Sequence, residues 1–154
     1  MVQKIDVTIA KLRLLLADVS AKERQYGAVR QQSRDQLRRA VDYSVYGDSS
    51  LDGTLSLMGE IQQRIIDAET ALRDLELIRT RAERELESLQ ITKRIEGAKA
   101  ELQKLLDQQA ELEREAAAGA GSDGLRQEVG EQIRQLRQQI NEASEQAART
   151  LGRR

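Results

Sequence analysis

Residues 72–105 read LRDLELIRTRAERELESLQITKRIEGAKAELQKL, and this stretch decides the fold. Its apolar side chains recur at alternating steps of three and four residues, which is the seam spacing of a coiled-coil helix. The seam that ends at Leu89 restarts at Ile91, on another face of one uninterrupted helical pattern. A change of packing partner near residue 90 explains this change of phase.

Only two short stretches of the 154-residue chain break the helical pattern, at 46–53 and 119–124. Both are rich in Gly, Ser and Asp, which favour turns and helix ends over helix interiors. The chain has no proline that would force a helix to stop elsewhere. The sequence therefore predicts three helices, near 3–46, 51–118 and 124–151.

The residues in the two breaks suggest how the helices end and begin. Gly47 is predicted to end the first helix in the left-handed conformation, which glycine adopts without a steric penalty. Side-chain oxygens that accept free backbone amides are expected to start the next helices. The candidate caps are Ser49, Ser50 and Asp52 for the second helix, and Ser122 and Asp123 for the third.

The helix lengths predict how the chain folds. The second helix, at about 100 Å, is about as long as the other two together. We therefore expect an all-α, elongated antiparallel coiled coil of three helices, in which one long central helix (about 51–118) has a shorter helix folded back on each half. Residues 1–90 would form a first antiparallel hairpin. Residues 91–154 would form a second hairpin that shares the central helix.

The predicted seam follows heptad spacing along all three helices. Its positions are Val2, Ile5, Ile9, Leu12, Leu16, Val19, Glu23, Tyr26, Arg30, Ser33, Leu37 and Ala40; Met58, Ile61, Ile65, Ala68, Leu72, Leu75, Arg79, Ala82, Leu86 and Leu89; Ile91, Ile95, Ala98, Leu102, Leu105, Gln109, Leu112 and Ala116; and Val129, Ile133, Leu136, Ile140, Ala143 and Ala147. An antiparallel register that stacks Tyr26 on Leu72 places Arg79 one layer from Glu23. We therefore predict an ion pair between Glu23 and Arg79; the alternative is that both side chains extend out of the seam.

The composition argues against catalysis. The chain has no His and no Cys, and its Asp and Glu residues are spread along helix surfaces at charge-pair spacing. Gly119, Gly121 and Gly124 lack the Lys-Ser/Thr that follows in a phosphate-binding loop. We expect no enzymatic activity, no cofactor and no metal site.

The charge distribution supports the first hairpin and disfavours nucleic acid as a partner. The net charge is −1, whereas nucleic-acid binders usually carry a basic excess. Residues 1–46 hold nine Lys or Arg and five Asp or Glu, whereas residues 47–90 hold five and ten. Opposite signs that face each other across a hairpin help to set partner and orientation.

A second set of apolar residues lies away from the predicted seam. These residues, called the apolar stripe below, are Val7, Leu14, Leu15, Ala21, Ala28, Val29, Leu57, Leu77 and Ile78, with Ala71 beside them. A solvated face does not need them, and exposed apolar patches usually mark contacts. The favoured interpretation is self-association, with two hairpins forming a four-helix bundle. The alternatives are an unidentified protein partner and apolar residues scattered over the surface.

A basic cluster lies near the end of the first helix, at Arg30, Arg34, Arg38 and Arg39. The first three share a helix face at four-residue spacing. They could hold an anionic group of a partner, and are therefore a candidate anion patch. The structural alternative is that they pair with local acids, such as Asp35, or with the acidic second helix.

These features favour a non-enzymatic structural or adaptor protein: a homo-oligomeric rod, with a dimer favoured, that acts as a scaffold for protein–protein interaction. A less favoured alternative is a helical protein that assembles on an anionic membrane, because residues 1–19 are amphipathic. A helical chaperone or a nucleic-acid-associated helper is a further alternative. Charged residues interrupt the N-terminal apolar stretch, so this stretch is not expected to be a signal peptide. We therefore expect a cytoplasmic protein.

Overall fold

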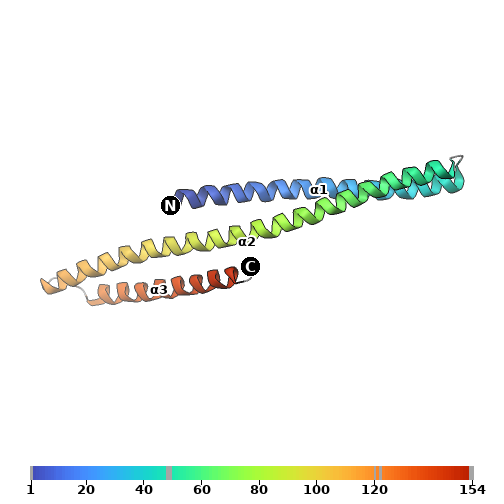
Figure 1. Cartoon of the computed structure of the whole chain (residues 1–154). Helices are drawn as coiled ribbons and strands as arrows, with labels where there is room; N and C mark the ends of the chain where they lie inside the picture. The colour runs from blue at the N-terminus through green and yellow to red at the C-terminus, as the bar shows by residue number, and fades with distance from the viewer. Residues whose placement is uncertain (1, 48–49, 120, 122, 153–154) are drawn as a thin grey trace. The chain divides into compact units, whose positions relative to one another are not determined.

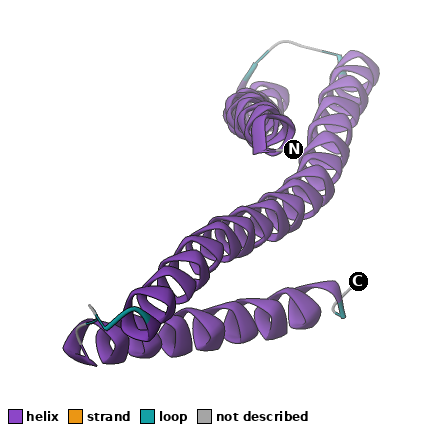
Figure 2. Ribbon diagram, turned by 90° about the vertical axis from the view of Figure 1, so that its left-hand side faces the viewer, coloured by secondary structure: helices purple, strands orange, loops and turns teal. Residues whose placement is uncertain are grey.

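The protein consists of three α-helices in the computed structural model, which describes residues 2–47, 50–119, 121 and 123–152. The helices are α1 (Val2–Tyr46), α2 (Leu51–Ala117) and α3 (Asp123–Leu151) (Figure 1). Apart from these helices, the described residues form only short loops and turns (Figure 2). The predicted all-α fold with three helices is confirmed, and each predicted boundary lies within one residue of the observed one.

The helices group into two compact units, and α2 contributes to both. Unit 1 comprises Met1–Ile9 and Arg84–Arg154, and unit 2 comprises Ala10–Glu83. In unit 2, α1 runs antiparallel to the first part of α2, and in unit 1, α3 runs antiparallel to its last part (Figure 1). The first residues of the chain also contact α2 in unit 1, where Lys93 Nζ lies 2.6 Å from Asp6 Oδ1. The predicted domain boundary at residue 90 stays a prediction.

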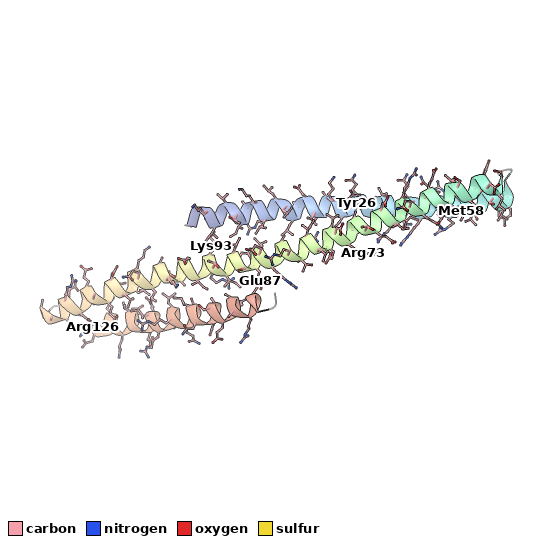
Figure 3. All side chains as sticks on the ribbon, viewed as in Figure 1. Tyr26, Met58, Arg73, Glu87, Lys93 and Arg126 are labelled. Atoms are coloured by element: carbon pink, nitrogen blue, oxygen red, sulfur yellow. The ribbon has the colours of Figure 1, made fainter. Side chains whose placement is uncertain are left out.

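The core of each unit is a narrow seam between helices. Every predicted seam residue is buried or half-buried, apart from Val2, whose side chain lies outside the described part of the chain. Tyr26 and Met58, labelled in Figure 3, are half-buried members of the seam in unit 2. The most buried apolar residues are Ile61 and Ala68 in unit 2 and Ile91 in unit 1, each 2% exposed. The heptad pattern therefore identifies the residues that hold the helices together.

The end of α1 differs from the prediction. Gly47 is not left-handed, since Gly119 is the one described residue with a positive φ. Instead, the Gly47 N–H donates to the Tyr43 carbonyl at 2.8 Å and continues the helical hydrogen-bond pattern. A Cβ at Gly47 would lie 2.6 Å from that carbonyl oxygen. Close approach of the backbone, and not a left-handed turn, is therefore what glycine permits at this position.

Ser50 caps the start of α2, as one of the predicted alternatives. Its Oγ accepts a hydrogen bond from the Gly53 N–H at 3.1 Å, and its carbonyl accepts one from the Thr54 N–H at 3.0 Å. Asp52 lies in the first turn, where its charge is favourable next to the positive end of the helix dipole. Ser49 lies outside the described residues.

The loop between α2 and α3 contains the left-handed turn. Gly119 has a φ of 84°, and its N–H donates to the Ala116 carbonyl at 3.1 Å. A glycine in this conformation just after a helix satisfies carbonyls that the helix leaves free. Asp123 begins α3 and pairs with Arg126 one turn later. The other candidate cap, Ser122, lies outside the described residues.

Two glycines should respond to alanine with opposite signs. Gly97 lies in the interior of α2 with nothing within 4 Å of an added Cβ, so Gly97→Ala should raise the free energy of unfolding by about 0.5–1 kcal/mol. Gly119→Ala should lower it by about 1–2 kcal/mol, because an L residue is strained at positive φ. Urea denaturation followed by circular dichroism measures both changes. Two changes of the same sign would contradict the assigned conformations.

Candidate interaction surface

The apolar stripe lies on the surface of the protein. All nine of its residues are exposed, including Leu14 at 67% and Leu77 at 71%. Val7 belongs to unit 1, and the other eight belong to unit 2. Within unit 2, Leu14 of α1 and Leu77 of α2 are thus large apolar side chains that lie mostly in solvent.

A groove opens between the two helices of unit 2, near the loop that joins them. It has a volume of about 490 Å³ and is called the tip groove below. Helix α1 contributes Gln36, Arg39, Ala40 and Tyr43, and α2 contributes Gly53, Thr54, Leu57, Ile61 and Arg64. Its floor is mainly apolar, the guanidinium groups of Arg39 and Arg64 line it, and none of its described lining residues is acidic.

The sequence patterns did not predict this groove. Gly53, at the start of α2, presents no side chain, and Ala40 presents only a methyl group, so the helices leave a hollow between larger neighbours. A second hollow along α1, lined by Ala28, Gln31, Gln32, Asp35, Gln36 and Arg39, shares Gln36 and Arg39 with the tip groove. The stripe residues Leu57 and Ala28 thus line adjoining hollows in unit 2.

The four arginines of the candidate anion patch lie in different surroundings. Arg34 Nη2 donates to Glu69 Oε1 of α2 at 3.0 Å, so the predicted pairing with the acidic second helix is observed there. Arg30 is half-buried in the seam, and Arg38 is exposed. Arg39 is exposed and lines the tip groove. Among the four, Arg39 is therefore the arginine placed beside an apolar surface.

The predicted ion pair between Glu23 and Arg79 is confirmed. Arg79 Nε donates to Glu23 Oε1 at 2.9 Å, and Arg79 Nη2 donates to Ser20 Oγ at 2.8 Å. Glu83 Oε1 lies 3.5 Å from Arg79 Nη1. The hydrogen bond with Glu23 raises the pKa of Arg79 above its ordinary value, against a smaller opposing effect of desolvation. The side chain therefore stays charged well beyond neutral pH, and its ion pair with Glu23 persists there.

A double-mutant cycle measures the coupling between these two residues. Glu23→Gln and Arg79→Gln should each lower the midpoint of urea denaturation, because each removes the charge-assisted hydrogen bond between them. The double variant should lose less than the two single losses added together. Arg34→Gln with Glu69→Gln, a more exposed pair in the same unit, serves as the comparison and should show weaker coupling. Additive losses at Glu23 and Arg79 would show that the two side chains are not energetically coupled.

Comparison with known proteins returned no match. No protein-family model, no curated protein and no solved structure matches this chain.

The described residues lack the features of two further classes of site. No helix there carries an apolar stretch long enough to cross a bilayer. Within the same residues, no group of three or more His, Cys, Asp or Glu side chains is placed to hold a metal ion.

Proposed function

We propose that this chain is a non-enzymatic structural or adaptor protein that self-associates through the apolar stripe and thereby forms a helical scaffold for other proteins. The exposure of the stripe carries this proposal. Large apolar side chains such as Leu14, Leu77 and Ile78 remain in water in the single chain. Burial of apolar surface contributes roughly 25 cal/mol per Å², so a contact that covers them is favourable.

The arrangement of the stripe on one face of unit 2 supports the proposal over scattered apolar residues. The tip groove is lined by Gln36 and Tyr43 of α1 and by Leu57 and Arg64 of α2, so these positions face the same side of the hairpin. Residues at seven-residue intervals from them share that side in a coiled coil. On this basis Val29, seven residues before Gln36, and Leu15, 28 residues before Tyr43, share that side. Ala71 and Ile78 also share it, because each lies 14 residues after Leu57 and Arg64, respectively. Apolar residues therefore recur along this side of both helices, with Lys22, Gln36 and Arg64 between them.

The test is the mass of the particle in solution. Size-exclusion chromatography with light scattering should give a multiple of the 17.3 kDa chain mass, with a dimer expected. The variant Leu14→Gln, Leu77→Gln, Ile78→Gln should shift the protein to the monomer, since it removes the apolar surface that the contact buries. A matched control changes Leu55 and Ile66 to glutamine, because both are exposed apolar residues outside the stripe.

Two outcomes would contradict the proposal. The first is a monomeric wild-type chain at micromolar concentration, and the second is a stripe variant that keeps the wild-type mass. In either case the stripe is left for a different protein, or for a membrane, and flotation with anionic vesicles then distinguishes these two. The membrane alternative uses apolar residues of the first helix such as Ile9 and Val19, which are 6% and 3% exposed in the folded chain. That burial weighs against it.

A further inference from the structure

We infer that the partner on the stripe of unit 2 is a second copy of the same chain, related by a two-fold axis, with Leu14 and Leu15 of each copy seated in the tip groove of the other. This inference rests on the proposed self-association and adds its geometry. In the resulting four-helix bundle, α1 lies against α1 of the second copy in the opposite direction, and α2 lies likewise against α2.

The shape of the face carries the inference. At one end it is hollow, at the tip groove between Tyr43 and Leu57. At the other end, called the protruding end below, the neighbouring leucines Leu14 and Leu15 are exposed, at 67% and 41%. Protein contacts pack to the density of protein interiors, so a hollow needs a protrusion to fill it. An antiparallel two-fold arrangement places each protruding end over a hollow, whereas a parallel one places the two grooves over each other and leaves a void.

Small side chains lie on both helices at the level where such an axis would pass, with Val29 next to one of them. Ala28 of α1 and Ala71 of α2 lie between the hollow and the protruding end. They also lie at the same level of the hairpin. Arg79 donates to Ser20 across the seam, so these two residues are level with each other. Ala28 lies eight residues after Ser20, and Ala71 lies eight residues before Arg79. In an antiparallel pair, these equal steps bring Ala28 and Ala71 level as well. An axis at this level brings Leu14 opposite Tyr43 of the second copy.

Charges along the edge of the face agree with the same axis. Arg39 comes opposite Asp18 of the second copy, and Glu60 comes opposite Arg81. All four side chains are exposed, and none of them forms an ion pair within the described part of its own chain. Two-fold symmetry makes each of these pairs occur twice.

Charge alone does not select the antiparallel arrangement. A parallel stack would also oppose unlike charges, with Arg39 near Glu60 and Asp18 near Arg81. Near the antiparallel axis, Asp67 comes close to Asp74 of the second copy, which is an unfavourable contact between like charges. A hydrogen bond that Gln63 Nε2 donates to Asp67 at 2.9 Å offsets part of this repulsion. The hollow and the protrusion therefore decide the direction, and the two sets of charge pairs supply a test of it.

The face is large enough for a stable dimer. From Leu14 to Tyr43, α1 runs about 44 Å at 1.5 Å per residue, and two packed helices are about 20 Å wide. Each copy would bury roughly 900 Å², or about 1,800 Å² for the pair, within the range of stable protein interfaces of about 1,200–2,000 Å².

Cysteine cross-linking tests the direction, since the chain has no cysteine of its own. Lys11→Cys and Tyr46→Cys label the two ends of the face at exposed positions outside the groove. A short bismaleimide should link a mixture of the two variants, because each label comes opposite the other in the antiparallel dimer. Lys11→Cys alone should not link to itself, since its two copies are about 52 Å apart along α1. A link between two copies of the Lys11→Cys variant, with no link between Lys11→Cys and Tyr46→Cys in the mixture, would overturn the inference.

Charge reversal gives an independent measurement. Arg39→Glu should weaken the dimer about tenfold, because two unlike pairs become like pairs. Adding Asp18→Arg to the same chain should restore the dimer, whereas adding Glu60→Arg should not. Rescue by Glu60→Arg instead would show a parallel dimer and overturn the inference while leaving the proposed self-association intact. A wild-type monomer in light scattering would overturn both proposals.

Discussion

Replacing Ile61 by alanine should lower the free energy of unfolding by about 2–5 kcal/mol, as large-to-small substitutions in a packed core do. Ile61 is 2% exposed in the seam of unit 2 and also forms part of the floor of the tip groove. The substitution removes buried apolar atoms and leaves a cavity, because neighbours across the seam relax only partly. Urea denaturation followed by circular dichroism measures the loss.

The matched control is Ile66→Ala on the same helix. Ile66 is 53% exposed, and alanine is the better helix former, so this change should shift the free energy of unfolding by less than about 1 kcal/mol. Both variants delete the same atoms from the same residue type, so the difference between them isolates burial. Equal losses at the two positions would show that the seam does not lie where the structure places it.

Introducing aspartate at Ile133 should release α3 from α2 in unit 1. Ile133 is 5% exposed, and a carboxylate at that position has no cation to pair with in the seam. Burying an uncompensated charge costs several kcal/mol, or forces the helix to rotate or detach. We expect a loss of about 3 kcal/mol or more from unit 1 and rapid hydrogen exchange along Asp123–Leu151. Mass spectrometry of peptic fragments resolves the exchange by helix.

Gln135→Asp is the control for the lower helix propensity of aspartate. Gln135 is exposed on α3, so the same residue is introduced two positions away without burial. Its exchange should remain close to that of the wild type. Slow exchange of α3 in the Ile133→Asp variant would mean that the α2–α3 seam contributes little to holding this helix.

The helices and the seam could be predicted because they depend on local sequence. The three- and four-residue spacing marks which residues pack, and the Gly- and Ser-rich breaks at 46–53 and 119–124 mark where helices end. The ion pair between Glu23 and Arg79 was also predictable, because charged residues in a seam have few partners within reach. These features follow from positions along the chain alone.

The tip groove could not be predicted in the same way. It arises from the absence of side chains at Gly53 and the small one at Ala40, and its existence depends on how two helices meet in three dimensions. The predicted left-handed conformation of Gly47 was wrong for a related reason. Glycine permits both a left-handed turn and a close approach to a carbonyl, and sequence does not distinguish these two uses.

The order of the helices along the chain has a consequence during synthesis on the ribosome. The first half of α2 emerges after α1, the helix that covers it in unit 2, whereas its last part in unit 1 emerges before α3. At roughly 5–20 residues per second, residues that include Ile95, Leu102 and Leu105 remain uncovered for about 2–11 s until α3 is made. During that interval the apolar residues of this part of α2 are exposed, and they can contact a ribosome-associated chaperone or a neighbouring nascent chain.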